Sequence, residues 1–211
     1  MFLFPFFSLA TENKPLLYLA EIEGEIKAGT HQYLKRVIKI AEEEKAEYLI
    51  IKLDTPGGLL QSTRDIADLL LATPVKTVVF VHKEGGWAYS AGTFILLAAD
   101  LAFVNPTASI GAAQPVEMFG EAEVSDKMME GTVSWIRGLA EARERDPEIA
   151  EKFVRENLTL TGREAQEIGI IDGTARTLDE LFFGLGIADP EIIRISLTAV
   201  ESFLIFFPTL I

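Results

Sequence analysis

Residues 75–100 read "VKTVVFVHKEGGWAYSAGTFILLAAD" and contain the local pattern that decides the fold. The first part, 75–86, is an apolar run that closes on paired glycines, which indicates a buried strand followed by a turn. The second part, 89–100, is apolar on all sides, which indicates a helix buried in the core. A strand that hands over to a helix through glycines is typical of a βαβ unit.

The same alternation of strand and helix extends in both directions from this stretch. Apolar runs predict further strands at 16–26, 47–58 and 101–112, and periodic patterns predict helices at 30–46, 59–73 and 125–145. Farther on, Pro147 opens another helix, and Thr161 with Glu164 has the spacing of a capping box. This order predicts an α/β fold with a mostly parallel sheet, whose strand ends are the usual place for ligands.

Composition excludes several classes of function. The 211 residues carry a formal net charge of −13, which argues against nucleic acid as a partner because phosphate contacts need clustered Lys and Arg. There are no cysteines, so disulfides and thiolate nucleophiles are excluded. Only two histidines are present, and a histidine-rich metal site is therefore not expected.

Both ends of the chain are apolar. The stretch "MFLFPFFSLA" makes residues 1–12 a candidate signal or membrane segment. The stretch "SFLIFFPTLI" makes 186–211 a C-terminal segment whose tail is a candidate start of a membrane span, or else packs on the core. Residues 13–185 between them are expected to form one domain. The ends therefore predict membrane association.

Ser90 is the candidate nucleophile. It lies where the strand meets the buried helix, so unsatisfied amides and the positive end of the helix dipole would favour negative charge beside it. The pattern A-x-S-x-G around it is close to the G-x-S-x-G of a nucleophile elbow. In "DTPGG", the pair Gly57 and Gly58 could bring backbone N–H groups close to an oxyanion. The alternatives are a helix-capping serine and an ordinary turn.

A serine nucleophile needs a base, and neither His31 nor His82 has a convincing aspartate partner in the sequence. A lysine is the other known solution, provided that its pKa is lowered. Lys127 fits because it lies at the start of a predicted helix, where the dipole disfavours an ammonium group. The alternatives are that Lys127 is an ordinary exposed lysine, or that Lys52 or Lys83 is the base.

Five ordered motifs resemble those of the NfeD-type membrane-associated serine proteases, relatives of Clp protease and signal peptide peptidase A. The resemblance spans about residues 16–182, and its motifs are "LDTPGG" (53–58), "YSAGTFILLAAD" (89–100), "NPTASIGAAQPV" (105–116), "DKMMEGTVSWIRGLAE" (126–141) and "LTLTGREAQEIGIIDGTARTLDEL" (158–181). No single motif is specific for this family, but the five motifs in this order are.

The resemblance implies a Clp/crotonase-like superhelix of repeated strand-strand-helix units with a mostly parallel sheet. It implies a Ser-Lys dyad of Ser90 and Lys127, with the amides of Gly58 and Ala91 as the oxyanion hole and with no metal or cofactor. It also implies a membrane-associated protein with an extracytoplasmic protease domain and a stomatin-like partner. Relatives assemble, so a homo-oligomer, at least a dimer, is expected.

The sequence thus predicts a serine endopeptidase that hydrolyses apolar segments of a peptide or membrane protein. The residues expected to contact substrate are mostly apolar: Gly57, Trp87, Tyr89, Met118, Phe119 and Met128. One alternative is a crotonase-type acyl-CoA hydratase or isomerase, with Glu117 or Glu121 as an acidic catalyst. The other is a non-catalytic scaffold that binds a stomatin-like partner through an apolar groove.

Overall fold

A computed structural model describes residues 14–116 and 125–206 of the chain. Its centre is a six-stranded sheet in which every neighbouring pair is parallel. From edge to edge the strands are β8 (Gly173–Thr174), β5 (Leu101–Val104), β3 (Lys76–Val81), β2 (Tyr48–Asp54), β1 (Leu16–Glu23) and β9 (Glu191–Arg194). The mostly parallel α/β sheet expected from the alternation of strands and helices is confirmed.

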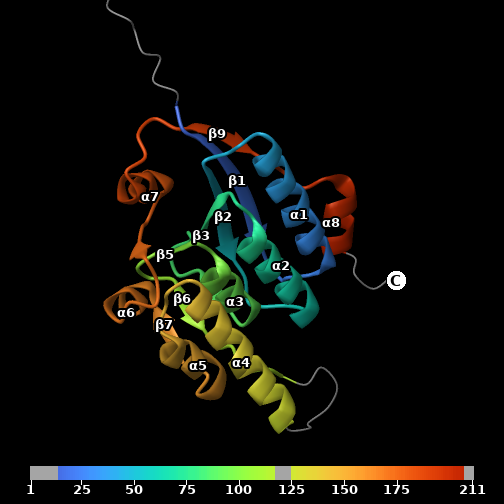
Figure 1. Ribbon diagram of the computed structural model, residues 1–211, viewed down its shortest axis with the longest axis vertical. Helices are drawn as coiled ribbons and strands as arrows, with labels where there is room; N and C mark the ends of the chain where they lie inside the picture. The colour runs from blue at the N-terminus through green and yellow to red at the C-terminus, as the bar shows by residue number, and fades with distance from the viewer. Residues whose placement is uncertain (1–13, 117–124, 207–211) are drawn as a thin grey trace, which may run out of the picture.

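Helices cover both faces of this sheet, because its strands are apolar on both sides. Along β1, Tyr18 and Ala20 join the larger core, while Leu17 and Leu19 join a smaller core on the opposite face. The larger core is covered by α1 (Ala28–Glu43), α2 (Leu60–Ala72), α3 (Ala91–Ala98), α4 (Asp126–Ala142) and α5 (Pro147–Arg155) (Figure 1). The smaller core is closed by α7 (Leu178–Leu185).

A second, three-stranded sheet lies beside the main one. It contains β4 (Trp87–Tyr89), β6 (Ser109–Gly111) and β7 (Thr159–Thr161), and β7 leads into the short helix α6 (Gly162–Glu167). A bridge between Thr55 and Ala88 joins the two sheets. The predicted helix 89–100 therefore starts later than expected, at Ala91, because the residues before Ser90 pair as a strand.

Local capping signals account for several helix boundaries. The Ser125 side chain accepts a hydrogen bond from the Met128 amide at 3.3 Å, and so begins α4 as predicted. Thr161 and Glu164 form the predicted capping box, in which the Thr161 amide donates to the Glu164 carboxylate at 2.8 Å. Pro147 occupies the first turn of α5, where a missing N–H costs nothing.

The C-terminal segment packs on the rest of the molecule as far as it is described. β9 extends the main sheet beyond β1, and α8 (Ala199–Phe206) lies along α1 (Figure 1). Arg36 on α1 donates two hydrogen bonds of 2.8 Å to the buried Glu201 carboxylate, and they lower the pKa of Glu201 to about 2. The candidate signal or membrane segment 1–12 lies outside the described residues, as do the last residues, 207–211, of the apolar tail that is the candidate start of a membrane span.

Candidate active site

Ser90 occupies a strained backbone conformation between β4 and α3. Its φ of 48° and ψ of −113° lie in a region that residues with a side chain rarely adopt. The strained strand-to-helix turn of a nucleophile elbow has this character, and it projects the hydroxyl away from the helix. Although Ser90 is the N-cap of α3, its side chain makes no capping hydrogen bond. The alternative of a helix-capping serine is therefore wrong.

Buried hydrogen bonds fix this turn. The Ser90 amide donates to the carbonyl of Gly111 on β6 at 3.0 Å. The fully buried hydroxyl of Thr93 lies 2.8 Å from the carbonyl of Ala88 and accepts from the Gly111 amide at 2.9 Å. Because the polar groups of the turn are satisfied by its neighbours, the surrounding structure can hold Ser90 in its unfavourable conformation. Sequence reasoning missed Thr93, whose signal is a polar residue inside an otherwise apolar helix.

The paired glycines of "DTPGG" pack against Ser90. The Gly57 amide donates to the Thr55 hydroxyl at 3.1 Å, which folds the loop back on itself. A Cβ at Gly57 would lie 2.9 Å from the Ser90 Cβ, and one at Gly58 would lie 2.2 Å from the Ile26 carbonyl oxygen. Both glycines have positive φ, 129° and 158°. Only glycine therefore brings this loop so close to the serine.

Two backbone amides beside Ser90 are free to bind an anion. Ala91 is the first residue of α3, so its N–H has no partner within the helix. Among the described residues, neither the Ala91 amide nor the Gly58 amide donates a hydrogen bond. Both residues line the same pocket as Ser90. Paired donors of this kind are the chemical requirement for stabilising a tetrahedral oxyanion.

The pocket at Ser90 has a volume of about 310 Å³ and is mostly apolar. Its lining comes from the glycine loop, α2, α3, the residues after β6, and α4: Gly58, Leu60, Thr63, Ser90, Ala91, Phe94, Ala113, Pro115, Val116, Met128 and Thr132. Leu60, Val116 and Met128 are exposed apolar residues within this set. A pocket of this size and character accepts an apolar side chain of a peptide.

Some predicted substrate contacts lie elsewhere. Met128 lines the pocket and Gly57 abuts Ser90, as expected. Trp87 and Tyr89 form a ring pair with centroids 5.6 Å apart, and neither is among the described residues that line the pocket. Met118 and Phe119, like Glu117 and Glu121 of the acyl-CoA alternative, lie outside the described residues. Sequence reasoning missed Phe94, which lines the pocket one helical turn after Ser90.

The three candidate lysines differ in their ion pairs. Lys52 pairs with Glu21, and Lys83 lies 2.8 Å from Asp54 and 3.2 Å from Glu23. The hydrogen bond to Asp54, followed by that to Glu23, raises the pKa of Lys83 and keeps it protonated. Lys83 is therefore a poor base, and the side chain of Lys52 is held by Glu21 on β1.

Lys127 lies in the first turn of α4. Its side chain is exposed and has no ion pair or hydrogen bond with any part of the chain that the structure describes. The next residue, Met128, lines the pocket, whereas Lys127 does not. The residues that precede α4, 117–124, lie outside the described part of the chain.

Another group of titratable residues lies away from Ser90. Glu21, Glu23 and His82 bring their ligand atoms within 4.8 Å of one another, the sort of cluster that can hold a metal ion. Burial, followed by the charge of Lys52, lowers the pKa of His82, so its imidazole is neutral at pH 7. However, Lys52 and Lys83 already neutralise the two carboxylates. Any cation at this place would have to displace two ammonium groups.

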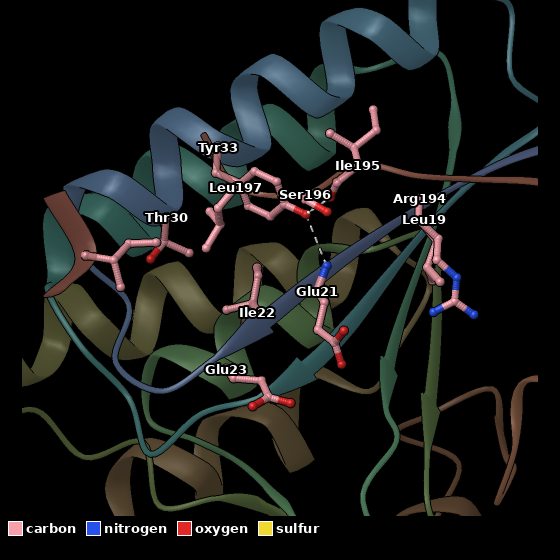
Figure 2. Close-up of a pocket in the computed structure, with 11 residues that line it drawn as sticks. Leu19, Glu21, Ile22, Glu23, Thr30, Tyr33, Arg194, Ile195, Ser196 and Leu197 are labelled. Atoms are coloured by element: carbon pink, nitrogen blue, oxygen red, sulfur yellow. Dashed lines mark hydrogen bonds between the residues drawn. The ribbon is translucent and has the colours of Figure 1, made fainter. Parts of the chain in front are cut away.

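The two glutamates also line a second cavity, of about 520 Å³, beside α1 (Figure 2). It lies where β9 ends and the chain leaves β1, and Tyr33 projects into it. The Tyr33 hydroxyl accepts from the Glu21 amide at 3.2 Å and donates to the Ile195 carbonyl at 2.5 Å. These bonds replace the sheet pairing that β1 loses there.

No histidine lines the Ser90 pocket among the described residues, so the structure offers no Ser-His pair.

Comparison with known proteins identifies the family. Residues 16–195 match the family described as "NfeD1b, N-terminal domain", which is most of the chain.

The chain belongs to the NfeD1b N-terminal domain family.

The relatives agree with this assignment. The chain is 35% identical over 172 residues to "Membrane-bound protease PH1510" of Pyrococcus horikoshii, covering 80% of this chain and 39% of that protein. It therefore spans about two fifths of the relative's length. Among the described residues of this NfeD1b-family chain, no helix is both long and apolar enough to cross a bilayer.

Solved structures confirm the predicted fold. A serine-to-alanine mutant of the "1510-N membrane-bound stomatin-specific protease" matches with a TM-score of 0.83 at 30% identity, covering 88% of this chain and all of that one. A lysine-to-alanine mutant of that protease, in complex with a substrate peptide, matches with a TM-score of 0.85 at 29% identity over 90% of this chain and 96% of that one. ClpP1 from Listeria monocytogenes shares the fold, with a TM-score of 0.62 at 22% identity over 77% of this chain and 94% of that one. The Clp-type fold and the NfeD family, both predicted from the motifs, are confirmed.

Proposed function

We propose that this domain is a serine endopeptidase with Ser90 as its nucleophile. The proposal rests on Ser90, which has a strained backbone, a side chain that makes no capping hydrogen bond, and a place in the lining of an apolar pocket beside two unpaired amides. A strained turn that leaves its hydroxyl free has no use as a structural cap, but it is what a nucleophile needs. The names of the relatives, a membrane-bound protease and a stomatin-specific protease, support the same reaction class.

In the proposed mechanism, neutral Lys127 accepts the proton of the Ser90 hydroxyl as its oxygen attacks a peptide carbonyl. The amides of Gly58 and Ala91 donate to the resulting oxyanion. Lys127 then passes the proton to the leaving amine, the C–N bond breaks, and an acyl-enzyme remains. A water molecule, deprotonated by Lys127, hydrolyses this ester and restores the serine.

Lys127 is the proposed base for three reasons. The other candidates, Lys52 and Lys83, are held by carboxylates. Lys127 itself has no ion-pair partner among the described residues, and it lies in the first turn of α4, beside the pocket. Its neighbours Met128 and Thr132 already line the pocket, so the start of α4 forms one wall of the site. A bound peptide that covers this wall would also remove water from the lysine.

The proposed substrate is an apolar peptide segment of a membrane protein, with a stomatin-like partner as the source. The mostly apolar pocket and its exposed rim residues support an apolar substrate. The 1510-N protease is specific for a stomatin homolog, which supports the choice of partner. We further propose that the protein is membrane-associated with this domain outside the cytoplasm, and that it forms at least a dimer.

The test is labelling by a serine-directed peptide phosphonate with an apolar side chain at the reacting position. We expect the wild type to be labelled, Ser90→Ala to be inert, and Lys127→Ala to lose the rise of the labelling rate with pH. Lys83→Ala and the exposed-helix variant Lys35→Ala are matched lysine controls and should retain the rate. Labelling that survives in Ser90→Ala, or a loss in Lys83→Ala equal to that in Lys127→Ala, would contradict the assignment.

A further inference from the structure

The amino ends of three helices lie at the proposed active site, and each is next to one of its components. α2 follows Gly58, α3 follows Ser90, and α4 begins next to Lys127. The pocket lies between these helix starts. The reaction therefore depends on how accurately three separate helices are placed relative to one another, since the reacting groups must meet within a few tenths of an ångström.

One stack of side chains joins all three helices close to the site. The rings of Phe94 on α3 and Trp135 on α4 are stacked, with centroids 4.2 Å apart and planes 15° from parallel. The guanidinium carbon of Arg64 on α2 lies 4.4 Å from the centroid of the same tryptophan ring. Phe94 also forms the floor of the pocket and is 4% exposed. The stack thus connects the substrate pocket with the helix of the lysine.

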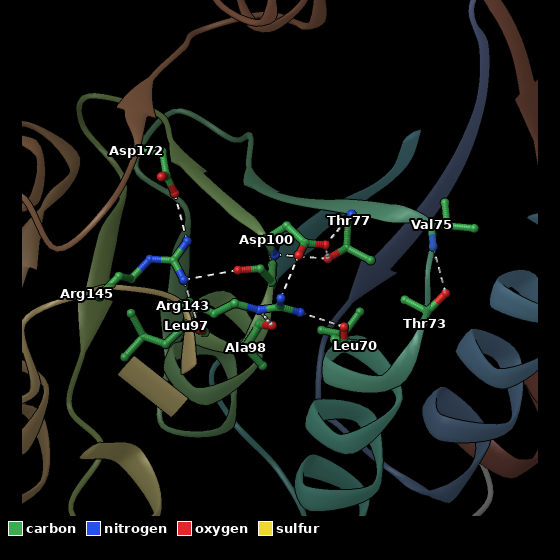
Figure 3. A network of polar contacts seen from close by, with 11 residues as sticks. Leu70, Thr73, Val75, Thr77, Leu97, Ala98, Asp100, Arg143, Arg145 and Asp172 are labelled. Atoms are coloured by element: carbon green, nitrogen blue, oxygen red, sulfur yellow. Dashed lines mark hydrogen bonds and ion pairs between the residues drawn. The ribbon is translucent and has the colours of Figure 1, made fainter. Parts of the chain in front are cut away.

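A second anchor holds the far end of α4. Arg143, which follows the helix, donates to the carbonyls of Leu70 on α2 and Ala98 on α3 at 2.7 and 2.8 Å, and pairs with Asp100 at 2.6 Å (Figure 3). Carbonyls at the ends of helices lack partners within the helix, and they favour a cation. This anchor joins α4 to the carboxyl ends of the same two helices whose amino ends form the site.

Resting on the proposed function, we propose that Trp135 is a positioning residue that sets the approach of Lys127 to Ser90. The stack and the arginine anchor are two of the contacts that hold α4 against α2 and α3, while the Glu130–Arg155 ion pair holds its first turns against α5. Lys127 lies eight residues before Trp135 and sixteen before Arg143, which is about 12 Å and about 24 Å along the helix axis. Of these two links to α2 and α3, the stack is the one nearer to the lysine.

The distances along α4 from Lys127 to Trp135 and to Arg143 indicate how far Lys127 would move if the stack were removed. Without the stack, Arg143, the core contacts of Val133 and Ile136, and the ion pair of Glu130 with Arg155 on α5 remain to hold the helix. A tilt of only about 5° about the Arg143 end would move the first turn of α4 by about 2 Å. A misplacement of about 1 Å can cost about a hundredfold in rate. Removing the stack should therefore reduce the reaction rate far more than it reduces substrate binding.

The test compares Trp135→Leu, which removes the stacked ring, with Trp135→Phe, which keeps one. Phe182→Leu is the control, because it also replaces an aromatic residue with leucine, but its buried ring lies in the core on the opposite face of the sheet. For each variant, phosphonate labelling and apolar peptide hydrolysis are measured from pH 6 to pH 10. We expect Trp135→Leu to lose about a hundredfold in kcat with little change in KM, and to shift the lysine-dependent rise in rate.

In the same comparison, Trp135→Phe should stay within a few-fold of the wild type, and Phe182→Leu should keep the wild-type pH profile. Arg64→Gln, which removes the cation without disturbing the core, should lower kcat in the same direction but less, and it serves if Trp135→Leu fails to fold. Wild-type kinetics in both Trp135→Leu and Arg64→Gln would overturn the inference, as would an equal loss in Phe182→Leu. A wild type that the phosphonate does not label refutes the proposed function, and with it this inference.

Discussion

The backbone strain at Ser90 can be measured by exchanging the serine for two different small residues. Ser90→Ala and Ser90→Gly both remove the hydroxyl, so both should abolish peptide hydrolysis. They differ in what they do to a backbone at φ 48° and ψ −113°. Alanine keeps the Cβ that makes this conformation unfavourable, whereas glycine has none. The difference in stability between the two variants therefore reports the strain.

The expected magnitude follows from two opposing effects. A side-chain-bearing residue in such a region costs about 1–3 kcal/mol, which glycine relieves. Glycine loses about 0.5–1 kcal/mol through the greater entropy of its unfolded chain. Ser90→Gly should therefore be more stable than Ser90→Ala by about 1 kcal/mol, or about 2–4 °C in Tm for a domain of this size.

Urea unfolding followed by circular dichroism measures this difference. Ser134, an exposed residue inside α4, is the matched control. At that ordinary helical position, the glycine variant should be less stable than the alanine variant by about 0.5–1 kcal/mol. If Ser90→Gly is also less stable than Ser90→Ala, the serine is not strained, and the argument that its turn is built for a nucleophile fails.

Three further predictions follow from the structure. Gly58→Ala would place a Cβ 2.2 Å from a backbone carbonyl oxygen, so it should lower the free energy of unfolding by about 2 kcal/mol or more and abolish phosphonate labelling. The control is Gly131→Ala, which has open space around it and should be neutral or stabilising by up to about 1 kcal/mol in the same urea assay. Thr93→Val leaves the buried Gly111 amide unpaired, so it should lower the free energy of unfolding by about 1–3 kcal/mol and slow the labelling of Ser90. Thr93→Ser keeps the hydroxyl and should restore both the stability and the labelling rate. Equal labelling rates in the two variants would count against the role of this hydroxyl. The pKa of Glu201, about 2 in the folded state, lies below its ordinary value of 4.5, so its contribution is present above pH 4.5 and is lost as the pH falls toward 2. After allowance for solvent screening this is about 1 kcal/mol. The hydrogen-exchange protection factors of α8, which are corrected for the intrinsic pH dependence of exchange, should fall as the pH is lowered from 4.5 toward 2 in the wild type but stay constant in Glu201→Gln.

Much of the fold is determined by local sequence, because hydrophobic periodicity and capping act over a few residues. The apolar runs at 16–26 and 47–58 predict β1 and β2, and Ser125 predicts the start of α4. The family motifs add the order of these elements. The short strand β4 has no such signal, and the stretch 101–112, predicted as one strand, divides into β5 and β6 in different sheets, because three-residue strands are stabilised by partners distant in the chain.

The candidate site divides in the same way. The sequence by itself determined that Ser90 follows a strand, that glycines precede α2, and that a lysine begins α4. It could not determine the sign of φ at Ser90, since that conformation is imposed by the hydrogen bond to Gly111 and by the packing of the glycine loop. A non-glycine residue adopts such a backbone only under tertiary constraint.

Only the tertiary structure decided which charged and aromatic groups meet. The sequence favours Lys127 as the base but leaves Lys52 and Lys83 as alternatives, and the carboxylates that pair with these two lie on β1 and β2. The stack of Phe94 and Trp135 likewise joins residues 41 positions apart. Local sequence sets the backbone preferences of each element, but contacts between elements depend on where the whole chain places them, because electrostatic and packing energies depend on distance in space rather than along the chain.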